Sequence, residues 1–317
     1  MSLIMRQVLG IDSSRNRLRN QFSYNNNPLA YQNVSRYSYN GALVNVVRTV
    51  TGFGGSFSYY SGVLMQDGRV FCSPQSSASA AIYNPFTNTI TTVSGFAGTS
   101  NAYRGAVLLQ DGRVFCVPCV STSAAIYNPF TNTVSTVTGF GGSGQAYIGG
   151  VLMQDGRVFC VPFNSTSAAI YNPFTNTVST VTGFAGFSAY IGGVLMADGR
   201  VFCVPYGSTS AAIYNPFTNS KTTVTGFVGT NAYNGGVLMA DGRVFCVPYG
   251  TTSAAIYNPL TDSISLVSGI SVCTGGVLLQ DGRVFCVPYS SSTAYIYGLP
   301  NSRLPNGRTM SNFYNKF

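Results

Sequence analysis

The chain has 317 residues, enough for one large all-β domain or two small ones. Apolar residues make up 45% of it and charged residues only 8%, against about 25% in an average domain. The net charge is +9, and the chain contains no Glu, His or Trp, so the usual residues of exposed helix faces are scarce and a helical protein is disfavoured.

The first segment, residues 1–38, is a basic, Asn-rich arm without a repeat. It lacks the apolar run of a secretory signal, and no segment of the chain approaches the ~20 apolar residues of a membrane span. We therefore expect a protein of the cytoplasm or of a virion. A basic arm can dock on an acidic protein surface, whereas nucleic acid is disfavoured because the regular alternation of basic and aromatic residues is missing. The predicted docking residues are Arg6, Arg15, Arg17 and Arg19.

Residues 39–297 are dominated by a repeat of 40 to 44 residues. A representative copy, residues 149–184, contains four strand signals: VLMQ, RVFCV, SAAIY and TVSTV. Asp-Gly after the first strand predicts a two-residue type I′ hairpin turn, and Asn-Pro-Phe-Thr-Asn predicts the turn between the third and fourth strands. Four short strands in this length are typical of one blade of a β-propeller.

The two ends of the repeat region indicate a closed ring. The last copy has its first three strand signals, through Tyr297, and then a basic tail at residues 298–317. The segment from Tyr39 to Phe53 matches the third-turn-fourth part of a copy. The sequence therefore predicts an all-β, six-bladed propeller in which Val44 to Thr51 forms the missing strand of the last blade. An open β-solenoid is the alternative.

The motifs GGVLMQDGRVF and AAIYNPFTNT resemble the kelch and galactose-oxidase-type propeller repeats over about residues 39–297. Two positions depart from that pattern. The usual Gly-Gly after the second strand is replaced by Cys160-Val161-Pro162, and the usual Trp after the third-strand turn is replaced by Val178. The resemblance implies the fold but carries no functional residue to this chain.

The candidates for catalysis are few. Without His, copper and zinc sites lose their common ligand, and a nucleophile activated by His is excluded. Six of the eight Asp lie in equivalent turns, spread around one face, so they cannot converge as a catalytic pair. We expect no enzymatic activity, no metal and no cofactor, and we interpret the Asp-Gly-Arg motifs as structural turns. They begin at Asp67, Asp111, Asp155, Asp198, Asp241 and Asp281.

Six of the eight Cys recur at one position of the second strand, too far apart for disulfides, and indicate a reducing compartment. Cys116 and Cys119 imitate a redox CxxC motif, but Cys119 stands where other copies have Phe or Tyr. Likewise Cys273 replaces a Tyr. The in-register residues are Cys72, Cys116, Cys160, Cys203, Cys246 and Cys286.

Two aromatic series fall on the face formed by the second-to-third and fourth-to-first loops, among Ser, Thr, Asn and Gly. They predict either a protein- or glycan-binding surface or rings packed between blades, and packing is the favoured interpretation for the Tyr series. The first series is Tyr59, Tyr103, Tyr147, Tyr190 and Tyr233, and the second is Phe163, Tyr206, Tyr249 and Tyr289.

Three functions remain open. The favoured one is a structural or interaction protein of a larger assembly, such as a virus or phage particle, that contacts other subunits through its faces and basic ends. The second is a glycan-binding, lectin-like propeller. The third is a cellular kelch-type adaptor.

Overall fold

The computed structural model describes residues 49–141 and 144–298. Almost all of them belong to one compact unit that begins at Val50. The arm with Arg6, Arg15, Arg17 and Arg19, the tail and most of the predicted closing strand lie outside the described residues. Thr49 to Thr51, the described end of that segment, is not in a strand.

The described residues form six antiparallel sheets, each with its strands in sequence order. This confirms the predicted all-β fold built from repeated four-stranded units. The first sheet holds β1 (Tyr59–Leu64), β2 (Val70–Pro74), β3 (Ser79–Asn84) and β4 (Thr89–Ser94). The second holds β5 (Tyr103–Leu108), β6 (Val114–Pro118), β7 (Ala124–Asn128) and β8 (Thr133–Val137). The third holds β9 (Tyr147–Leu152), β10 (Val158–Pro162), β11 (Ser167–Asn172) and β12 (Thr177–Thr182).

The fourth sheet holds β13 (Tyr190–Leu195), β14 (Val201–Pro205), β15 (Ser210–Asn215) and β16 (Ser220–Thr225). The fifth holds β17 (Tyr233–Leu238), β18 (Val244–Pro248), β19 (Ser253–Asn258) and β20 (Ser263–Ser268). The sixth has three described strands, β21 (Cys273–Leu278), β22 (Val284–Pro288) and β23 (Tyr295–Tyr297).

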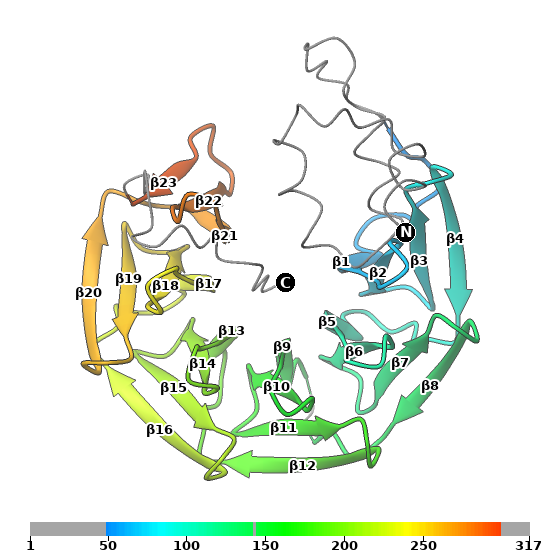
Figure 1. Ribbon diagram of the computed structural model, residues 1–317, viewed down its shortest axis with the longest axis horizontal. Helices are drawn as coiled ribbons and strands as arrows, with labels where there is room; N and C mark the ends of the chain where they lie inside the picture. Colours follow the sequence, from blue (N-terminus) through cyan, green and yellow to red (C-terminus); the bar gives the residue numbers. More distant parts are fainter. Residues whose placement is uncertain (1–48, 142–143, 299–317) are drawn as a thin grey trace, which may run out of the picture. The chain divides into compact units, whose positions relative to one another are not determined.

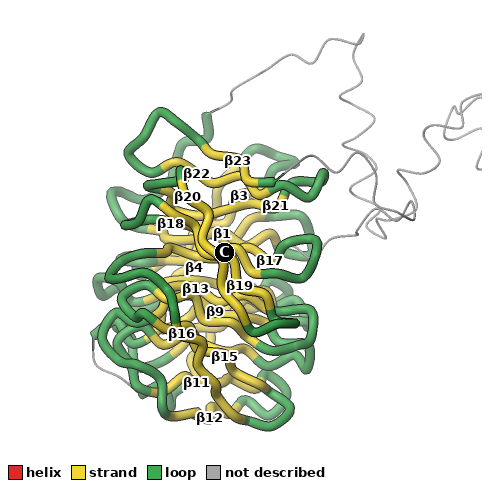
Figure 2. The backbone as a smooth tube through the Cα atoms, turned by 90° about the vertical axis from the view of Figure 1, so that its left-hand side faces the viewer, coloured by secondary structure: helices red, strands yellow, loops and turns green. Residues whose placement is uncertain are grey.

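The sheets follow one another around an arc, with the first strand of each on the inner side and the fourth on the outer side (Figure 1). The inner strands of neighbouring sheets lie against each other, from β1 and β5 to β17 and β21. Seen from the side, the strands occupy the middle and the loops lie along two opposite sides (Figure 2). The loops therefore form two faces, one with the first-to-second and third-to-fourth turns and one with the other loops.

The Asp-Gly hairpin differs from the predicted type I′ turn. Met153 and Gln154, which were expected to end the first strand, belong to the turn, because β9 ends at Leu152. The Met153 amide donates to the Arg157 carbonyl at 2.9 Å, and the Gly156 amide donates to the Met153 carbonyl at 3.1 Å. Gly156 has a φ of +82°, whereas Asp155 has no positive φ. This is a three-residue loop that ends in a left-handed glycine, so the two-residue prediction was wrong.

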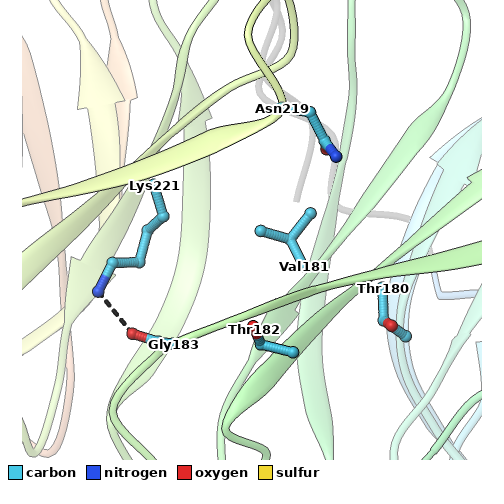
Figure 3. Close-up of a pocket in the computed structure, with 6 residues that line it drawn as sticks. All are labelled: Thr180, Val181, Thr182, Gly183, Asn219 and Lys221. Atoms are coloured by element: carbon cyan, nitrogen blue, oxygen red, sulfur yellow. Dashed lines mark hydrogen bonds between the residues drawn. The ribbon is translucent and has the colours of Figure 1, made fainter.

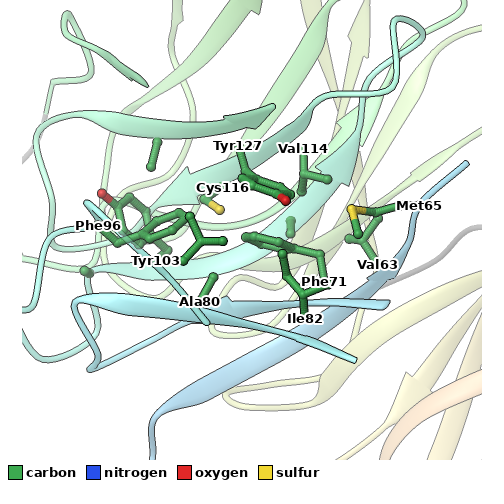
Figure 4. Close-up of a cluster of buried hydrophobic side chains, with 14 residues drawn as sticks. Val63, Met65, Phe71, Ala80, Ile82, Phe96, Tyr103, Val114, Cys116 and Tyr127 are labelled. Atoms are coloured by element: carbon green, nitrogen blue, oxygen red, sulfur yellow. The ribbon is translucent and has the colours of Figure 1, made fainter. Parts of the chain in front are cut away.

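The apolar core lies between neighbouring sheets (Figure 4). Phe71 of β2 stacks on Tyr127 of the next sheet, with ring centroids 5.2 Å apart, and Phe159 stacks in the same way on Tyr214 at 5.0 Å. The third-strand Tyr thus fills the space beside the preceding sheet, where an aromatic pair adds to the free energy gained by burial. The in-register Cys lie in the same layer, where Cys116 and Cys160 are fully buried.

Close approach of the inner strands requires a small residue in each first strand. A Cβ on Gly193 would lie 2.7 Å from Val151 Cγ2 and 3.0 Å from Val161 Cγ2 of the preceding sheet. In the second sheet the same position is Ala106, and there the preceding sheet has Ser73 where later sheets have valine. Space for a methyl group therefore appears where the facing side chain is smaller.

The two outermost described sheets expose side chains that the inner sheets bury. In the sixth sheet Val277 is 50% exposed and Ile296 is 51% exposed, whereas their counterparts Val151 and Ile170 are 6% and 1% exposed. Tyr83 of the first sheet is half-buried, although its counterparts in the second to fifth sheets are fully buried.

Candidate functional site

Each Asp-Gly-Arg turn is held by its own ion pair. In the third sheet Asp155 Oδ1 accepts a hydrogen bond from the Arg157 amide at 3.1 Å, and Oδ2 accepts one from Arg157 Nε at 2.8 Å. Arg157 Nη2 lies 2.6 Å from the same carboxylate and also donates to the Pro216 carbonyl of the next sheet at 3.4 Å. The pair therefore fixes one turn and ties two sheets together. Equivalent pairs form at Asp67, Asp111, Asp198, Asp241 and Asp281.

The charge balance of these turns follows from their geometry. Burial disfavours the charged form of Asp111, but the hydrogen bonds and positive charge of Arg113 outweigh it and hold the pKa of Asp111 below its ordinary value. A carboxylate that is already neutralised by its neighbour in this way is poorly placed to bind a cation or to accept a proton from a substrate.

The Asn-Pro-Phe turns on the same face are also built from local bonds. Asn172 Oδ1 accepts the Phe174 amide at 3.0 Å, and the Tyr171 hydroxyl donates to Asn176 Oδ1 at 3.0 Å. In the fifth sheet Asp262 takes the place of that second Asn and accepts from Tyr257 at 2.9 Å. Burial, together with Asp262, raises the pKa of Tyr257 to about 12. Asp262 belongs to none of the Asp-Gly-Arg motifs, but alignment of the copies places it at the position of Asn176.

The first aromatic series does not form a binding surface. Tyr103, Tyr147, Tyr190 and Tyr233 are at most 1% exposed. Each packs edge-on against the Phe that follows the preceding fourth strand, as Tyr190 does against Phe184 at 6.2 Å. Tyr59 is half-buried and contacts Phe53 at 5.9 Å. The four buried rings therefore fill the wedge between sheets and are removed from the candidate surface.

A belt of backbone hydrogen bonds runs along the inner edge of this face. The Cys119 amide donates to the Ala102 carbonyl at 2.8 Å, and the Ala146 amide of the next sheet donates to the Cys119 carbonyl at 2.7 Å. The Phe163 amide then donates to the Ala146 carbonyl at 2.8 Å, and the alternation continues through Ala189. The belt fixes the residue after each second-strand Pro by its main chain, independently of the side chain that it carries.

The second aromatic series occupies four of these positions and forms a continuous line of rings. We call Phe163, Tyr206, Tyr249 and Tyr289 the aromatic row. Successive ring centroids are 6.0, 6.2 and 5.3 Å apart. Phe163 is buried, Tyr206 and Tyr249 are half-buried, and Tyr289 is 45% exposed. Cys119 takes the aromatic position in the second sheet and packs with Phe163, so no CxxC chemistry is needed to explain it.

A polar group adjoins the row. We call Tyr60, Gln75, Asn101, Arg104 and Gln145 the Arg104 cluster. Arg104 Nη2 donates to Asn101 Oδ1 at 3.0 Å and Nη1 donates to Gln145 Oε1 at 3.4 Å. The guanidinium lies over the Tyr60 ring at 5.4 Å. Burial raises the pKa of the Cys119 thiol to about 11, although the charge of Arg104 opposes that rise. The sequence analysis did not single out this cluster.

A hollow lies elsewhere, on the outer strands. It measures about 460 Å³ and is lined by residues of β12 and by Asn219 and Lys221 of the fourth sheet (Figure 3). Lys221 donates to the Gly183 carbonyl across it and lies 5.7 Å from the Phe184 ring. Its only charged group is thus already bonded, and the hollow adds nothing to the aromatic row.

Among residues 49–141 and 144–298, no group of three or more Cys or Asp is arranged to hold a metal ion. No helix in the part of the chain that the structure describes is long and apolar enough to cross a membrane.

No protein-family model and no curated protein sequence matches the chain. Solved structures do. Virginiamycin B lyase from Staphylococcus aureus matches with a TM-score of 0.65 and 10% identity over 77% of this chain and 85% of that one. A structure of streptogramin B lyase matches with a TM-score of 0.60 and 12% identity over 77% and 83% of the two chains.

The extracellular domain of the one-component system BT4673 from B. thetaiotaomicron matches with a TM-score of 0.59 and 12% identity, over 73% of this chain and 32% of that one. None of these matches is specific to kelch repeats. Identities this low show the architecture alone: this chain has a β-propeller fold similar to that of the lyase.

Proposed function

We propose that this protein is a non-catalytic interaction module, a subunit of a larger assembly that contacts its partner through the face that carries the aromatic row. One observation carries the proposal. The row is a line of neighbouring aromatic side chains on this face that is partly exposed, whereas the Asp residues of the repeat are committed to turns on the opposite face.

The absence of His supports a non-catalytic role. One of the lyase structures is an inactive variant in which a histidine was replaced by alanine, bound to quinupristin. This chain contains no His in its full sequence. The lyase activity of that protein is therefore not carried over to this one.

We also propose that the six sheets close into a six-bladed ring, with Val44 to Thr51 as the fourth strand of the last blade. The apolar groups exposed on the sixth sheet, such as Val277 and Ile296, are those that every inner sheet buries against its neighbour. Half-buried Tyr83 and Phe285 are the pair that closure would stack, as Phe159 stacks on Tyr214. Pairing these groups would remove an exposed apolar surface and a free sheet edge.

Closure is tested at Gly62. A Cβ there meets Val70 Cγ1 at 3.5 Å, an ordinary contact. In a closed ring, Val277 and Val287 would face it, so Gly62→Ala should lower the midpoint of denaturant unfolding as much as Gly193→Ala does. A fully tolerated Gly62→Ala would mean that the first and sixth sheets do not meet. Deletion of residues 1–53 should also destabilise a closed ring.

The interaction proposal is tested by native mass spectrometry of the protein purified from its natural source at low salt. We expect masses above that of one chain. Replacing Tyr206 and Tyr249 by Ser should reduce the share of the larger species, whereas replacing Phe174 by Ser on the opposite face should not. A monomer under all conditions would contradict the proposal.

If the basic arm contributes to docking, replacing Arg15, Arg17 and Arg19 by Ser should weaken the complex and reduce its salt dependence.

Glycan binding is the second candidate, and the aromatic row is the observation that favours it. Partly exposed rings beside amide and hydroxyl groups can stack on a sugar ring and bind its hydroxyl groups. Asn164 lies next to Phe163 and is held by a hydrogen bond to the Gly144 carbonyl at 3.1 Å. A glycan array distinguishes the candidates, because an assembly subunit has no need to retain any glycan.

A further inference from the structure

We infer that the Arg104 cluster binds the carboxylate of an acidic carbohydrate whose sugar ring lies on the adjoining end of the aromatic row. This inference rests on the glycan-binding candidate and names the class of glycan.

Arg104 is not a residue that the repeat needs. The equivalent positions in the other five sheets hold Tyr60, Ile148, Ile191, Asn234 and Thr274. The strands on which these residues lie pair in the same way as β5 does. A charged side chain at this one position therefore has no role in building the sheet.

The charge of Arg104 is not neutralised by any acidic group in the described residues. Each of the six Asp in the Asp-Gly-Arg turns pairs with its own Arg, and those turns lie on the opposite face. Asp262 lies in a turn of that opposite face as well and accepts from Tyr257. Lys221, the other cation outside those pairs in the described part of the chain, lies on the outer strand β16.

The Arg104 guanidinium is held in place by its neighbours, and some of its N–H groups have no acceptor among them. Its two Nη atoms each donate to a neutral amide oxygen, of Asn101 and Gln145, which leaves a second N–H on each. Nε is buried and has no hydrogen-bond partner among the described residues. Gln75 Nε2 donates to the same Asn101 oxygen, and the Tyr60 ring supports the guanidinium plane. A planar, partly desolvated group with an uncommitted N–H on each Nη atom matches a carboxylate.

The cluster and the aromatic row adjoin each other. Gln145, which accepts from Arg104, is followed by Ala146, whose carbonyl accepts the Phe163 amide at 2.8 Å. Cys119, Ile148 and Phe163 pack together between the cluster and Tyr206. One ligand can therefore place a carboxylate on Arg104 and extend past buried Phe163 to the half-buried ring of Tyr206. Amides of Gln75, Asn101 and Gln145 around a lone cation favour a ligand rich in hydroxyl groups over an acidic peptide.

The test is a glycan array that carries uronic-acid and sialic-acid glycans, each beside its carboxyl-reduced, neutral counterpart, probed with the full chain. We expect the acidic member of at least one pair to bind about tenfold more tightly or better, the effect of a charge-assisted hydrogen bond. Arg104→Gln should abolish that preference, and Arg104→Lys should restore only part of it. Lys221→Gln removes one positive charge away from the cluster and should leave the preference unchanged.

Each other outcome has a distinct meaning. Equal binding of acidic and neutral members overturns the inference and leaves the glycan candidate standing. No binding to any glycan overturns both. A preference that survives Arg104→Gln, or that Lys221→Gln reduces equally, shows a general charge effect and overturns the Arg104 site. In a further outcome, an Asp-rich peptide is the only acidic ligand that binds through Arg104. That result would show that the ligand is a peptide and would overturn the assignment to carbohydrates. Unchanged unfolding midpoints of the variants show that the fold is intact.

Discussion

Substitution of Gly193 tests whether the inner strands are as tightly packed as the structure indicates. In Gly193→Ala the new methyl group meets Val151 and Val161 Cγ2 atoms at 2.7 and 3.0 Å. Both neighbours are rigid, β-branched side chains of the preceding sheet, so they cannot move aside without a change of rotamer. Overpacking of this kind destabilises the folded state by about 1–3 kcal/mol. Alanine also lowers the conformational entropy of the unfolded chain relative to glycine, and this offsets about 0.4–1 kcal/mol of that loss. The net loss should be about 1–2 kcal/mol.

A double-mutant cycle isolates the contact. Val151→Ala removes two methylene equivalents, worth about 1.6 kcal/mol, and eliminates the closer of the two contacts, the one at 2.7 Å. The double variant should therefore lose at least about 1 kcal/mol less than the sum of the single losses. Urea unfolding followed by circular dichroism gives the free energy of unfolding of the wild type, the two single variants and the double variant. The four values can be compared if that free energy depends on the urea concentration with the same slope in each protein. Losses that add within about 0.5 kcal/mol would show that the two sheets are not in contact there.

The remaining predictions concern the core, the turns and the thiols. Phe159→Ala should cost about 3–5 kcal/mol, because it removes a fully buried ring, whereas Phe174→Ala, at a ring that is 70% exposed, should stay near 0.5 kcal/mol by the same urea assay. Since the folded-state pKa of Asp111 is lowered, its contribution is present above the unfolded-state pKa and is lost as the pH falls through the folded-state value. In Asp111→Asn the free energy of unfolding should therefore fall less steeply than in the wild type as the pH is lowered from about 5 to about 2. The same pH dependence in both proteins would contradict this. In the native protein a thiol reagent should modify half-buried Cys72 before fully buried Cys160, and all eight Cys should react after denaturation without reductant. A disulfide between any two in-register Cys would contradict the sheet geometry.

The strands were predictable because the copies are nearly identical, so the Asp-Gly turn signal was seen six times and the Asn-Pro turn signal five times. The hairpin type was not, because Asp-Gly fits both a two-residue turn and a three-residue loop. The choice depends on Met153 leaving the strand to bond Arg157. The alternation of a strand assigns a residue to a side of the sheet, but it does not say whether a neighbouring sheet covers that side. The sequence therefore favoured packing for the series that contains Tyr147, but it could not separate that series from the partly exposed Tyr206.

The Arg104 cluster was missed for a different reason. Its members lie on three different sheets, and only the fold brings Tyr60, Arg104 and Gln145 together. A signal was nevertheless present in the sequence. Among copies that agree at most positions, Arg104 is the one cation at the second residue of a first strand. A departure from a regular repeat marks a position that the repeat itself does not require.

The backbone belt influences how the face that carries the aromatic row can change over evolutionary time. The residue after each second-strand Pro is held by main-chain bonds, from Cys119 through Phe163. Where the side chain faces solvent, as at Tyr289, it can change without disturbing the scaffold. The six copies hold Gln75, Cys119, Phe163, Tyr206, Tyr249 and Tyr289 at this position. New recognition properties can therefore arise by single substitutions on this rim at little cost in stability, while the turns and wedge positions keep the blades in register.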